Sequence, residues 1–250
     1  MHAGLPGTIR RRLDPGQRFG LRLTLVGAAI VLVAVPFSTL LLLVLSKDPL
    51  TRFDASVADA MNARVHDHHW MVVALQAISW MGRPPLLVVL VVAATCYVWR
   101  RGQPRLVAFL LVTPLGGGIV DTLVKAAVDR PRPVLDHPVA TALGKSFPSG
   151  HAMSSVVTYG ALLLVFLPVL RPAHRRPATG FTILLVLAIG ASRLLLGVHY
   201  VSDVVGGYVL GLAWLLGAVA TFETWRAEVG RRPSDPLDEG LEPEAAEALG

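Results

Sequence analysis

The sequence predicts an all-α, polytopic membrane protein with six transmembrane helices and additional short helices at the membrane interface. Of the 250 residues, 53% are hydrophobic and only 16% are charged, and the mean hydropathy is +0.57. This composition is too apolar and too poor in charge for an ordinary soluble domain. The apolar residues also gather in six stretches with arginines near their ends, as expected for helices that end at a membrane surface.

The six apolar stretches are the predicted spans. A helix needs about 20 residues to cross the hydrocarbon core of a bilayer. The first stretch has this length, whereas the second, third and fifth reach it only with flanking residues, since long arginine side chains can extend to the interface. The stretches cover residues 23–46, 84–99, 106–120, 152–170, 178–192 and 204–222.

A seventh apolar segment, residues 70–81, is about half as long as a span. Before it, Phe53, Val57, Met61 and Val65 recur every four residues, which predicts an amphipathic helix with these side chains on one face. We therefore expect residues 48–82 to form short helices along the membrane surface, which either cover a site or only pack.

The basic residues predict the orientation and the domain limits. If the N-terminus is cytoplasmic, the arginine groups within residues 10–22, 100–105, 171–176 and 226–232 all lie inside, as the positive-inside rule requires. This gives a basic cytoplasmic segment at 1–20, a six-helix transmembrane domain at 21–225 and, because residues 226–250 are acidic and rich in proline, a disordered cytoplasmic tail. The expected location is the plasma membrane.

The distribution of charge and the cysteine count argue against a nucleic-acid partner and an intramolecular disulfide. The net charge is +6, but the basic residues are spread over helix ends, so no nucleic-acid partner is expected. Cys96 is the single cysteine, so no intramolecular disulfide can form. The sequence does not indicate an oligomeric state.

The first polar motif, KAAVDRPRP, joins the third stretch to a proline-rich segment. Lys125 lies at the helix end, and Pro131 and Pro133 restrict the backbone on both sides of Arg132. A rigidly held guanidinium matches the forked arrangement of phosphate oxygens, and lysine adds a compact charge. The motif therefore indicates an anion site, although cations at an ordinary helix end would give the same pattern.

The second motif, Pro148-Ser149-Gly150-His151, directly precedes the fourth stretch. The N–H groups and dipole of a helix N-terminus favour an anion, glycine allows close approach, and the serine hydroxyl is a further donor. His151 would lie beside a bound phosphate, where it can protonate a leaving oxygen. A serine N-cap followed by an interfacial histidine is the alternative.

The third motif, SRLLLGVHYVSD, contains Arg193, His199 and Asp203. If the sixth helix begins near residue 198, His199 and Asp203 share one face, and the carboxylate can hold one imidazole nitrogen. The other nitrogen is then unprotonated, as a nucleophile requires. Arg193 adds a second guanidinium, and a purely structural His–Asp pair is the alternative. In the predicted topology all three motifs lie on the extracytoplasmic side.

Other polar residues are assigned lesser roles. Asp121 precedes Lys125 by four residues and is expected to neutralise it. The glycines at 116–118 favour close helix packing or a kink over a phosphate loop. Residues 66–69 resemble a metal patch, but adjacent residues do not share a helix face, so we expect a solvated cluster and no metal site.

Taken together, the three motifs resemble the signatures of the type 2 phosphatidic acid phosphatase superfamily, which includes lipid phosphate phosphatases and, more distantly, vanadium haloperoxidases. The signatures are Lys with Arg-Pro seven residues later, Pro-Ser-Gly-His, and Ser-Arg with His six and Asp ten residues after the arginine. Order and spacing agree across about 80 residues. The matching residues are Lys125, Arg132, Pro133, Pro148, Ser149, Gly150, His151, Ser192, Arg193, His199 and Asp203.

The resemblance implies a role for each matching side chain. His199, assisted by Asp203, would attack phosphorus to form a phosphohistidine, and His151 would protonate the departing group and then activate water. Cationic side chains, a hydroxyl and a backbone N–H would hold the phosphoryl oxygens without a metal or another cofactor. The residues implied for binding are Lys125, Arg132, Ser149, Gly150 and Arg193.

We therefore expect an integral membrane phosphatase that hydrolyses a lipid phosphate or diphosphate at the extracytoplasmic face. The resemblance most favours undecaprenyl diphosphate, whose dephosphorylation recycles the carrier lipid of cell-wall synthesis. Phosphatidylglycerol phosphate and phosphatidic acid are close alternatives, because the motifs bind phosphate and not the tail. A non-catalytic lipid-phosphate transporter or scaffold is disfavoured by the presence of both histidines and Asp203, and a soluble vanadate-dependent haloperoxidase by the six apolar stretches.

Overall fold

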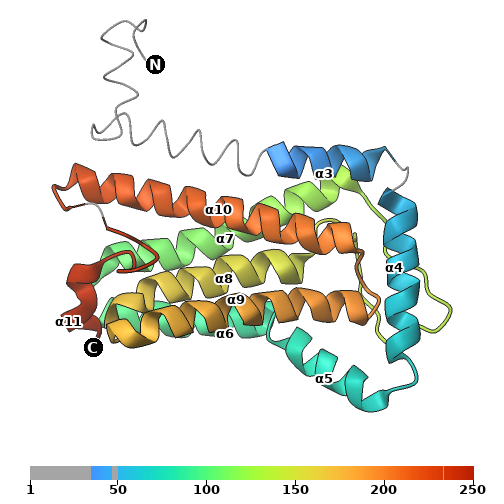
Figure 1. The fold of residues 1–250 in the computed structure, drawn as a ribbon. Coiled ribbons are helices and arrows are strands. Elements are labelled where there is room, and N and C mark those ends of the chain that lie inside the picture. Colours follow the sequence, from blue (N-terminus) through green and yellow to red (C-terminus); the bar gives the residue numbers. More distant parts are fainter. Residues whose placement is uncertain (1–34, 47–49, 233) are drawn as a thin grey trace, which may run out of the picture.

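The computed structural model describes residues 35–46, 50–232 and 234–250, and every regular element in this part of the chain is helical (Figure 1). The long helices lie side by side as a bundle, and α4 lies across one end of it. The elements are α3 (Val35–Leu45), α4 (Leu50–Val65), α5 (His69–Trp80), α6 (Pro84–Arg100), α7 (Pro104–Val128), α8 (Gly150–Phe166), η2 (Leu167–Val169), α9 (Pro172–Leu195), α10 (Val201–Glu228), η3 (Pro243–Ala245) and α11 (Ala246–Leu249).

Five helical segments of the described chain are long and apolar enough to cross a membrane. They cover His69–Arg100, Pro104–Val128, Gly150–Val169, Pro172–Leu195 and Val201–Glu228. Of the first predicted span, residues 23–46, the described part contains only α3 and Ser46, so the rest of that span lies outside the described residues. The multi-pass helical architecture is therefore present, and the six-span topology stays a prediction.

Residues 70–81 were predicted to lie along the membrane surface, but in the structure they belong to a candidate membrane span. This segment forms α5, which leads into α6 through a short turn at residues 81–83, and α5 and α6 together make up one of the five candidate spans. Figure 1 shows α5 inclined to α6 and directed toward α4. The difference arises because α5 packs against α9, which gives its apolar side chains a protein partner.

Helix α4 is amphipathic, but the four apolar residues predicted to share one face do not all pack against the protein. Phe53 is 54% exposed, whereas Asp54, Ala58, Asn62 and Val65 are buried. In a membrane protein an apolar side chain can face lipid as well as protein, so the apolar residues alone do not identify the packed face. The buried carboxylate of Asp54 has a polar partner, described below.

Helix α8 is the centre of the bundle, in contact with α6, α7, α9 and α10. Its approach to α10 requires glycine at two positions. A Cβ atom on Gly207 would lie 2.6 Å from the Ser149 carbonyl oxygen, and one on Gly211 would lie 2.9 Å from that of Met153. The N-termini of α8 and α10 are therefore close together, and the Ser149 N–H donates to the Asp203 carbonyl at 2.9 Å.

Residues 226–250 were predicted to be a disordered tail, but in the structure they are partly helical and pack against the bundle. Helix α10 continues to Glu228, and Leu241, Ala245 and Leu249 are buried in the same apolar cluster as Leu106 of α7. Arg226 is fully buried, and its charge is compensated by two hydrogen bonds to Glu244, of 3.0 and 3.1 Å. An acidic composition therefore does not prevent packing here, because one acid pairs with a buried arginine and three apolar residues reach the bundle.

Three of the four basic groups that predicted the orientation gather at this end of the bundle, and the fourth, within residues 10–22, lies outside the described residues. These three lie at the α6–α7 turn, at the start of α9 and at the end of α10. Several of them hold the C-terminal segment: Arg101 donates to the Ala248 carbonyl and Arg175 to the Asp238 carbonyl. The opposite end carries the three motifs.

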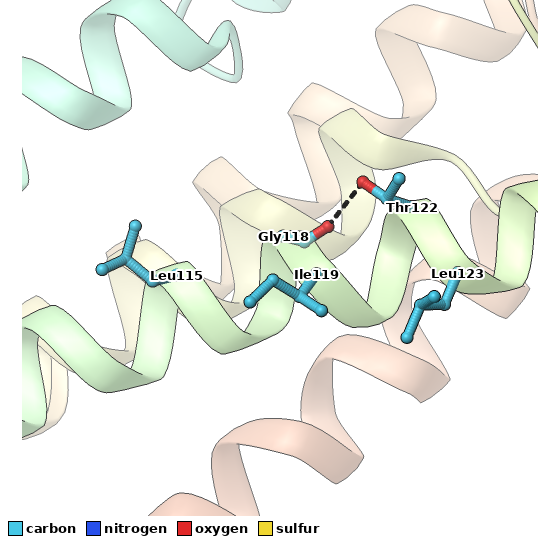
Figure 2. Close-up of a pocket in the computed structure, with 5 residues that line it drawn as sticks. All are labelled: Leu115, Gly118, Ile119, Thr122 and Leu123. Atoms are coloured by element: carbon cyan, nitrogen blue, oxygen red, sulfur yellow. Dashed lines mark hydrogen bonds between the residues drawn. The ribbon is translucent and has the colours of Figure 1, made fainter.

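The outer faces of the long helices are apolar. On α7, a shallow hollow is lined by Leu115, Gly118, Ile119, Thr122 and Leu123 (Figure 2). The Thr122 hydroxyl donates to the Gly118 carbonyl at 2.9 Å, so the polar group of this surface is satisfied within the helix. Such a surface suits contact with lipid.

Candidate active site

The eight residues singled out in the sequence lie at one end of the bundle, near α4. Six of them line a cavity of about 590 Å³, and Ser149 and Asp203 lie behind its wall, each with 0% exposed surface. The six come from the end of α7, the loop after it, the start of α8, the end of α9 and the α9–α10 connection. They are Lys125, Arg132, Gly150, His151, Arg193 and His199.

His199 and Asp203 contact each other, although not on a shared helix. Helix α10 begins at Val201, so His199 lies in the connection before it, and Asp203 lies in its first turn. Asp203 Oδ2 accepts the Tyr200 N–H at 2.8 Å and is 3.4 Å from His199 Nδ1. The carboxylate therefore both caps the helix and holds the imidazole.

The environment of His199 keeps its imidazole neutral. Burial lowers the pKa of His199 to about 4, and Asp203 opposes this shift only in part. On the other side of the ring, Nε2 is 3.1 Å from an Arg132 NH1 group. A proton on Nδ1 lets the ring donate to Asp203 and lets the Nε2 lone pair accept from Arg132, which also lines the cavity.

Arg132 is held rigidly by main-chain acceptors. Its guanidinium donates to the carbonyl oxygens of Leu143, Gly144 and Val198, at 2.9, 3.0 and 2.8 Å. These bonds attach the proline-rich loop to the segment that carries His199. The arrangement places a fixed positive charge beside the imidazole.

Lys125 has two oxygen partners within the cavity wall. Its Nζ donates to Asp121 Oδ1 at 2.5 Å and to the Pro148 carbonyl at 2.7 Å. The pairing with Asp121 predicted from their spacing is therefore present. The bond to Pro148 links α7 to the turn that precedes α8.

The turn before α8 has the geometry of an anion site. Ser149 occupies the N-cap position, but its hydroxyl makes no capping hydrogen bond, so the alternative of a serine N-cap does not describe its side chain. A Cβ atom on Gly150 would lie 3.3 Å from both Lys125 Nζ and Asp121 Oδ2, which leaves little room there for a larger residue. The first N–H groups of α8 are free of helical bonds by geometry.

Three buried polar atoms of the predicted site have no hydrogen-bond partner within the described chain. They are Ser149 Oγ, His151 Nε2 and Arg193 Nε. Arg193 is otherwise fixed, because its NH1 donates to Ser79 Oγ of α5 at 2.6 Å. Unpaired polar atoms of this kind are costly unless a ligand or water completes them.

The sequence analysis missed four side chains that support this site. Ser79 holds Arg193, Ser146 donates to Asp203 Oδ2, and Arg130 bridges Asp54 and Asp203. Arg130 stands within the first motif and could have been noticed there as a third cation. The only indication of a role for Asp54 in the sequence is that it is an acidic residue on a helix expected to pack. Nothing in the sequence links Asp54 to Asp203.

The other half of the cavity is apolar and is formed by helices α6, α7 and α8. Its wall includes Leu87, Val88 and Val91 of α6 and Leu111 and Leu115 of α7. The cavity thus joins a cationic end to an apolar wall. Among the described residues no group of three or more His, Cys, Asp or Glu side chains is placed to hold a metal ion.

Comparison with known proteins finds similarity in sequence and in fold. Residues 105–227 match the family model of the PAP2 superfamily. The crystal structure of a transmembrane PAP2-type phosphatidylglycerolphosphate phosphatase from Bacillus subtilis superimposes with a TM-score of 0.66 and 23% identity, over 79% of this chain and 97% of that one. This likeness supports the fold.

Three curated proteins are similar in sequence. Phosphatidylglycerophosphatase B of Bacillus subtilis is 28% identical over 148 residues, which are 57% of this chain and 71% of that protein. Decaprenylphosphoryl-5-phosphoribose phosphatase of Mycobacterium tuberculosis is 40% identical over 97 residues, and lipid A 1-phosphatase of Rhizobium etli is 31% identical over 113 residues. The latter two alignments cover 37% and 42% of this chain, and 48% and 45% of those proteins.

The matched residues 105–227 include every position of the three motifs, from Lys125 to Asp203. They also include the described helices α8, α9 and most of α7 and α10, which bring these motifs together. The chain carries a domain of the PAP2 superfamily.

Proposed function

We propose that this protein is a membrane phosphatase that hydrolyses a lipid phosphate or diphosphate through a phosphohistidine intermediate. The observation that carries the proposal is the set of three unpaired polar atoms on Ser149, His151 and Arg193. His151 and Arg193 line the cavity together with His199, and Ser149 lies behind its wall. A phosphoryl group would supply acceptors for the serine and arginine donors and a site of attack for the imidazole.

In the first proposed step, His199 Nε2 attacks phosphorus and the bond from phosphorus to the leaving oxygen breaks. The ring becomes positively charged, and Asp203 stabilises this charge through Nδ1–H. Lys125, Arg132 and Arg193 stabilise the negative charge of the phosphoryl oxygens, together with the Gly150 N–H. His151 donates a proton to the departing oxygen.

In the second step, water replaces the imidazole. His151, now neutral, accepts a proton from a water molecule that attacks the phosphohistidine, and inorganic phosphate leaves together with regeneration of His199. Both steps use positive side chains for the charge neutralisation that Mg²⁺ performs in other phosphoryl-transfer enzymes. We therefore propose that turnover does not require a metal ion.

The proposed substrate class follows from the two halves of the cavity. The cationic end fits the phosphate, and the apolar wall of α6 and α7 fits part of a lipid tail. The three curated relatives are named for lipids with different tails, all of them phosphatases. Undecaprenyl diphosphate, phosphatidylglycerol phosphate and phosphatidic acid are therefore the candidates that a direct comparison must separate.

We also propose that the site faces the extracytoplasmic side of the plasma membrane and that both termini are cytoplasmic. The support is the gathering of arginines at the opposite end of the bundle, which the positive-inside rule assigns to the cytoplasm. Reporter fusions in the 129–149 loop test this orientation. A cytoplasmic location of that loop contradicts it.

The deciding experiment measures phosphate release from the three candidate lipids by the purified, detergent-solubilised protein, with EDTA present. We expect release from at least one lipid, loss of release in His199→Ala, and near-normal release in His174→Ala, a control at an exposed histidine of α9. An acid-labile, alkali-stable phosphoprotein should form from lipid labelled in its phosphate and be absent in His199→Ala. A folded protein that releases phosphate from none of the lipids contradicts the proposal and leaves the non-catalytic transporter or scaffold.

A further inference from the structure

Helix α4 contributes one side chain to a buried charge cluster behind the site. Asp54, in the second turn of α4, has 0% exposed surface, and the Arg130 guanidinium donates to its Oδ2 at 2.7 Å. Two groups of Ser202 also bind this carboxylate: the N–H donates to Oδ1 at 3.2 Å, and the hydroxyl donates to Oδ2. Every hydrogen bond described for Asp54 thus goes to Arg130 or Ser202.

Arg130 connects Asp54 to the candidate catalytic pair. Its NH1 donates to Asp203 Oδ1 at 2.7 Å and to Ser202 Oγ at 2.6 Å, and its guanidinium lies 4.2 Å from the centre of the Tyr200 ring. The other oxygen of Asp203 faces His199. A chain of contacts therefore runs from Asp54 through Arg130 and Asp203 to the imidazole.

The charges in this cluster explain why a second carboxylate is useful. Arg130 is 8% exposed, so its charge is poorly screened by water. Paired with Asp203 alone, it would neutralise the carboxylate on which the imidazolium of the covalent step depends. Asp54 compensates Arg130, so Asp203 keeps negative charge to share with His199.

We infer that Asp54 is a positioning residue, which acts through Arg130 to set the orientation and charge of Asp203 and thereby of His199. This inference rests on the proposed phosphatase function. Asp54 does not line the cavity, so it does not touch the substrate. Its loss is therefore expected to lower kcat and to leave KM almost unchanged.

The test compares Asp54→Asn with Asp59→Asn, which removes the same charge from an exposed position of the same helix. We expect kcat per folded molecule to fall about 10- to 100-fold in Asp54→Asn, with KM within about twofold, and both constants to stay near wild type in Asp59→Asn. A purely structural role would reduce the yield or Tm of the protein and leave kcat of the folded fraction unchanged. A kcat within about twofold of wild type in folded Asp54→Asn overturns the inference.

A double-mutant cycle tests the route through Arg130. Arg130→Lys keeps the charge but cannot bridge two carboxylates with one planar fork. If Asp54 acts through Arg130, the double variant loses about as much kcat as Arg130→Lys alone, whereas multiplied losses contradict this route. Should Asp54→Asn not yield folded protein, Arg130→Lys alone must lose at least about tenfold in kcat at constant KM, and a wild-type kcat overturns the inference.

A measurement that does not depend on turnover tests the positioning role of Asp54 independently of the proposed phosphatase function. The ¹⁵N chemical shifts of the His199 ring report which nitrogen carries the proton. We expect one tautomer, protonated at Nδ1, in the wild type and a mixture in Asp54→Asn. Unchanged shifts overturn the positioning role, whereas an inactive wild-type protein with these shift changes contradicts only the phosphatase function.

Discussion

At the scale of single residues, the most informative group is the neutral imidazole of His199, held between a carboxylate and a guanidinium. The residue is almost fully buried, yet it lines the cavity, and its Nε2 is 3.1 Å from an Arg132 NH1 group. Burial disfavours the protonated form, and the protonated form cannot attack phosphorus. In the proposed mechanism, the pKa of this group therefore decides the acid limit of the reaction.

A pH profile of kcat/KM tests this environment. Since burial lowers the pKa of His199 to about 4, the ring stays unprotonated as the pH falls from 7 to 5. Ionisation of the substrate phosphate also changes the rate, so it is measured by ³¹P NMR in the same micelles and its contribution is removed from the profile. We expect the remaining loss of kcat/KM on the acid side to have its midpoint between about pH 4 and 5, below the pKa near 6.5 of a free histidine. A corrected midpoint near 6.5, reversible on return to pH 7, contradicts the prediction.

A second residue-scale prediction concerns Asp121, which lies in the cavity wall and binds Lys125. Asp121→Asn removes a negative charge close to the proposed phosphate position, so anions should bind more tightly. We expect the inhibition constant of inorganic phosphate to fall about three- to tenfold. Asp129→Asn, which removes a carboxylate that pairs with Lys145 in the exposed loop, should change it little. Weaker phosphate binding in Asp121→Asn would show that Asp121 mainly orients Lys125.

The eight candidate residues could be found from the sequence because three short motifs contain them all. Spacing within a motif carries chemical information, as the Asp121–Lys125 pair shows. Asp54 and Ser79 could not be found in this way, since their partners stand 76 to 148 positions later in the chain. Such pairs depend on packing between helices, which no local pattern encodes.

At the scale of helices, the site depends on how closely α8 and α10 approach. This approach brings the turn before α8, with Ser149, against the first turn of α10, with Asp203. The absence of a side chain at Gly207 and Gly211 permits it, as the short distances to backbone oxygens show. The position of α10 against α8 is therefore part of the geometry of the candidate site.

Gly207→Ala tests this dependence. The new Cβ would meet a backbone oxygen at 2.6 Å, so α10 must shift away from α8, at a cost of about 1–3 kcal/mol of stability. We expect a lower Tm and a lower kcat, because Asp203 moves with the helix. Gly217→Ala is the matched control, since nothing lies within 4 Å of its Cβ position and alanine favours a helix. Equal effects of the two substitutions contradict the packing argument.

The helices themselves were easier to predict than the faces that they bury. Long apolar runs identified the bundle, and α7 is longer than its run because it begins at Pro104 and continues past Asp121 and Lys125. For α4, the predicted apolar face does not coincide with the packed face, since Phe53 is exposed and Val65 is buried. A membrane offers apolar side chains a second environment. The polar residues Asp54 and Asn62 mark the packed face instead.

At the scale of the whole molecule, the two ends of the bundle differ in what they contain. One end carries the candidate site and α4, and the other is closed by the C-terminal segment. The composition of that segment predicted disorder, because three apolar residues among many acids give no periodic signal. Its order comes from contacts with distant parts of the chain, such as the Leu241 N–H donating to the Leu164 carbonyl at 3.1 Å.

Leu241→Ala tests whether this end serves stability alone. Leu241 has 0% exposed surface, so truncation should cost about 2–5 kcal/mol and lower the Tm. We expect kcat per folded molecule to remain unchanged, because the cavity lies at the other end. Leu237→Ala, at a 69% exposed position, is the control and should leave both quantities unchanged. A selective loss of kcat in Leu241→Ala would instead indicate coupling between the two ends.

The bonds from Asp54 to Arg130 and Ser202 also bear on how the protein is made. Asp54 is synthesised early, whereas Ser202 and Asp203 belong to the last long helix, which enters the membrane after all the others. In a nascent chain that lacks α10, the proposed nucleophile, His199, therefore has no Asp203 carboxylate to orient it. Under the proposed mechanism, hydrolysis of membrane lipids can begin only after α10 is in place.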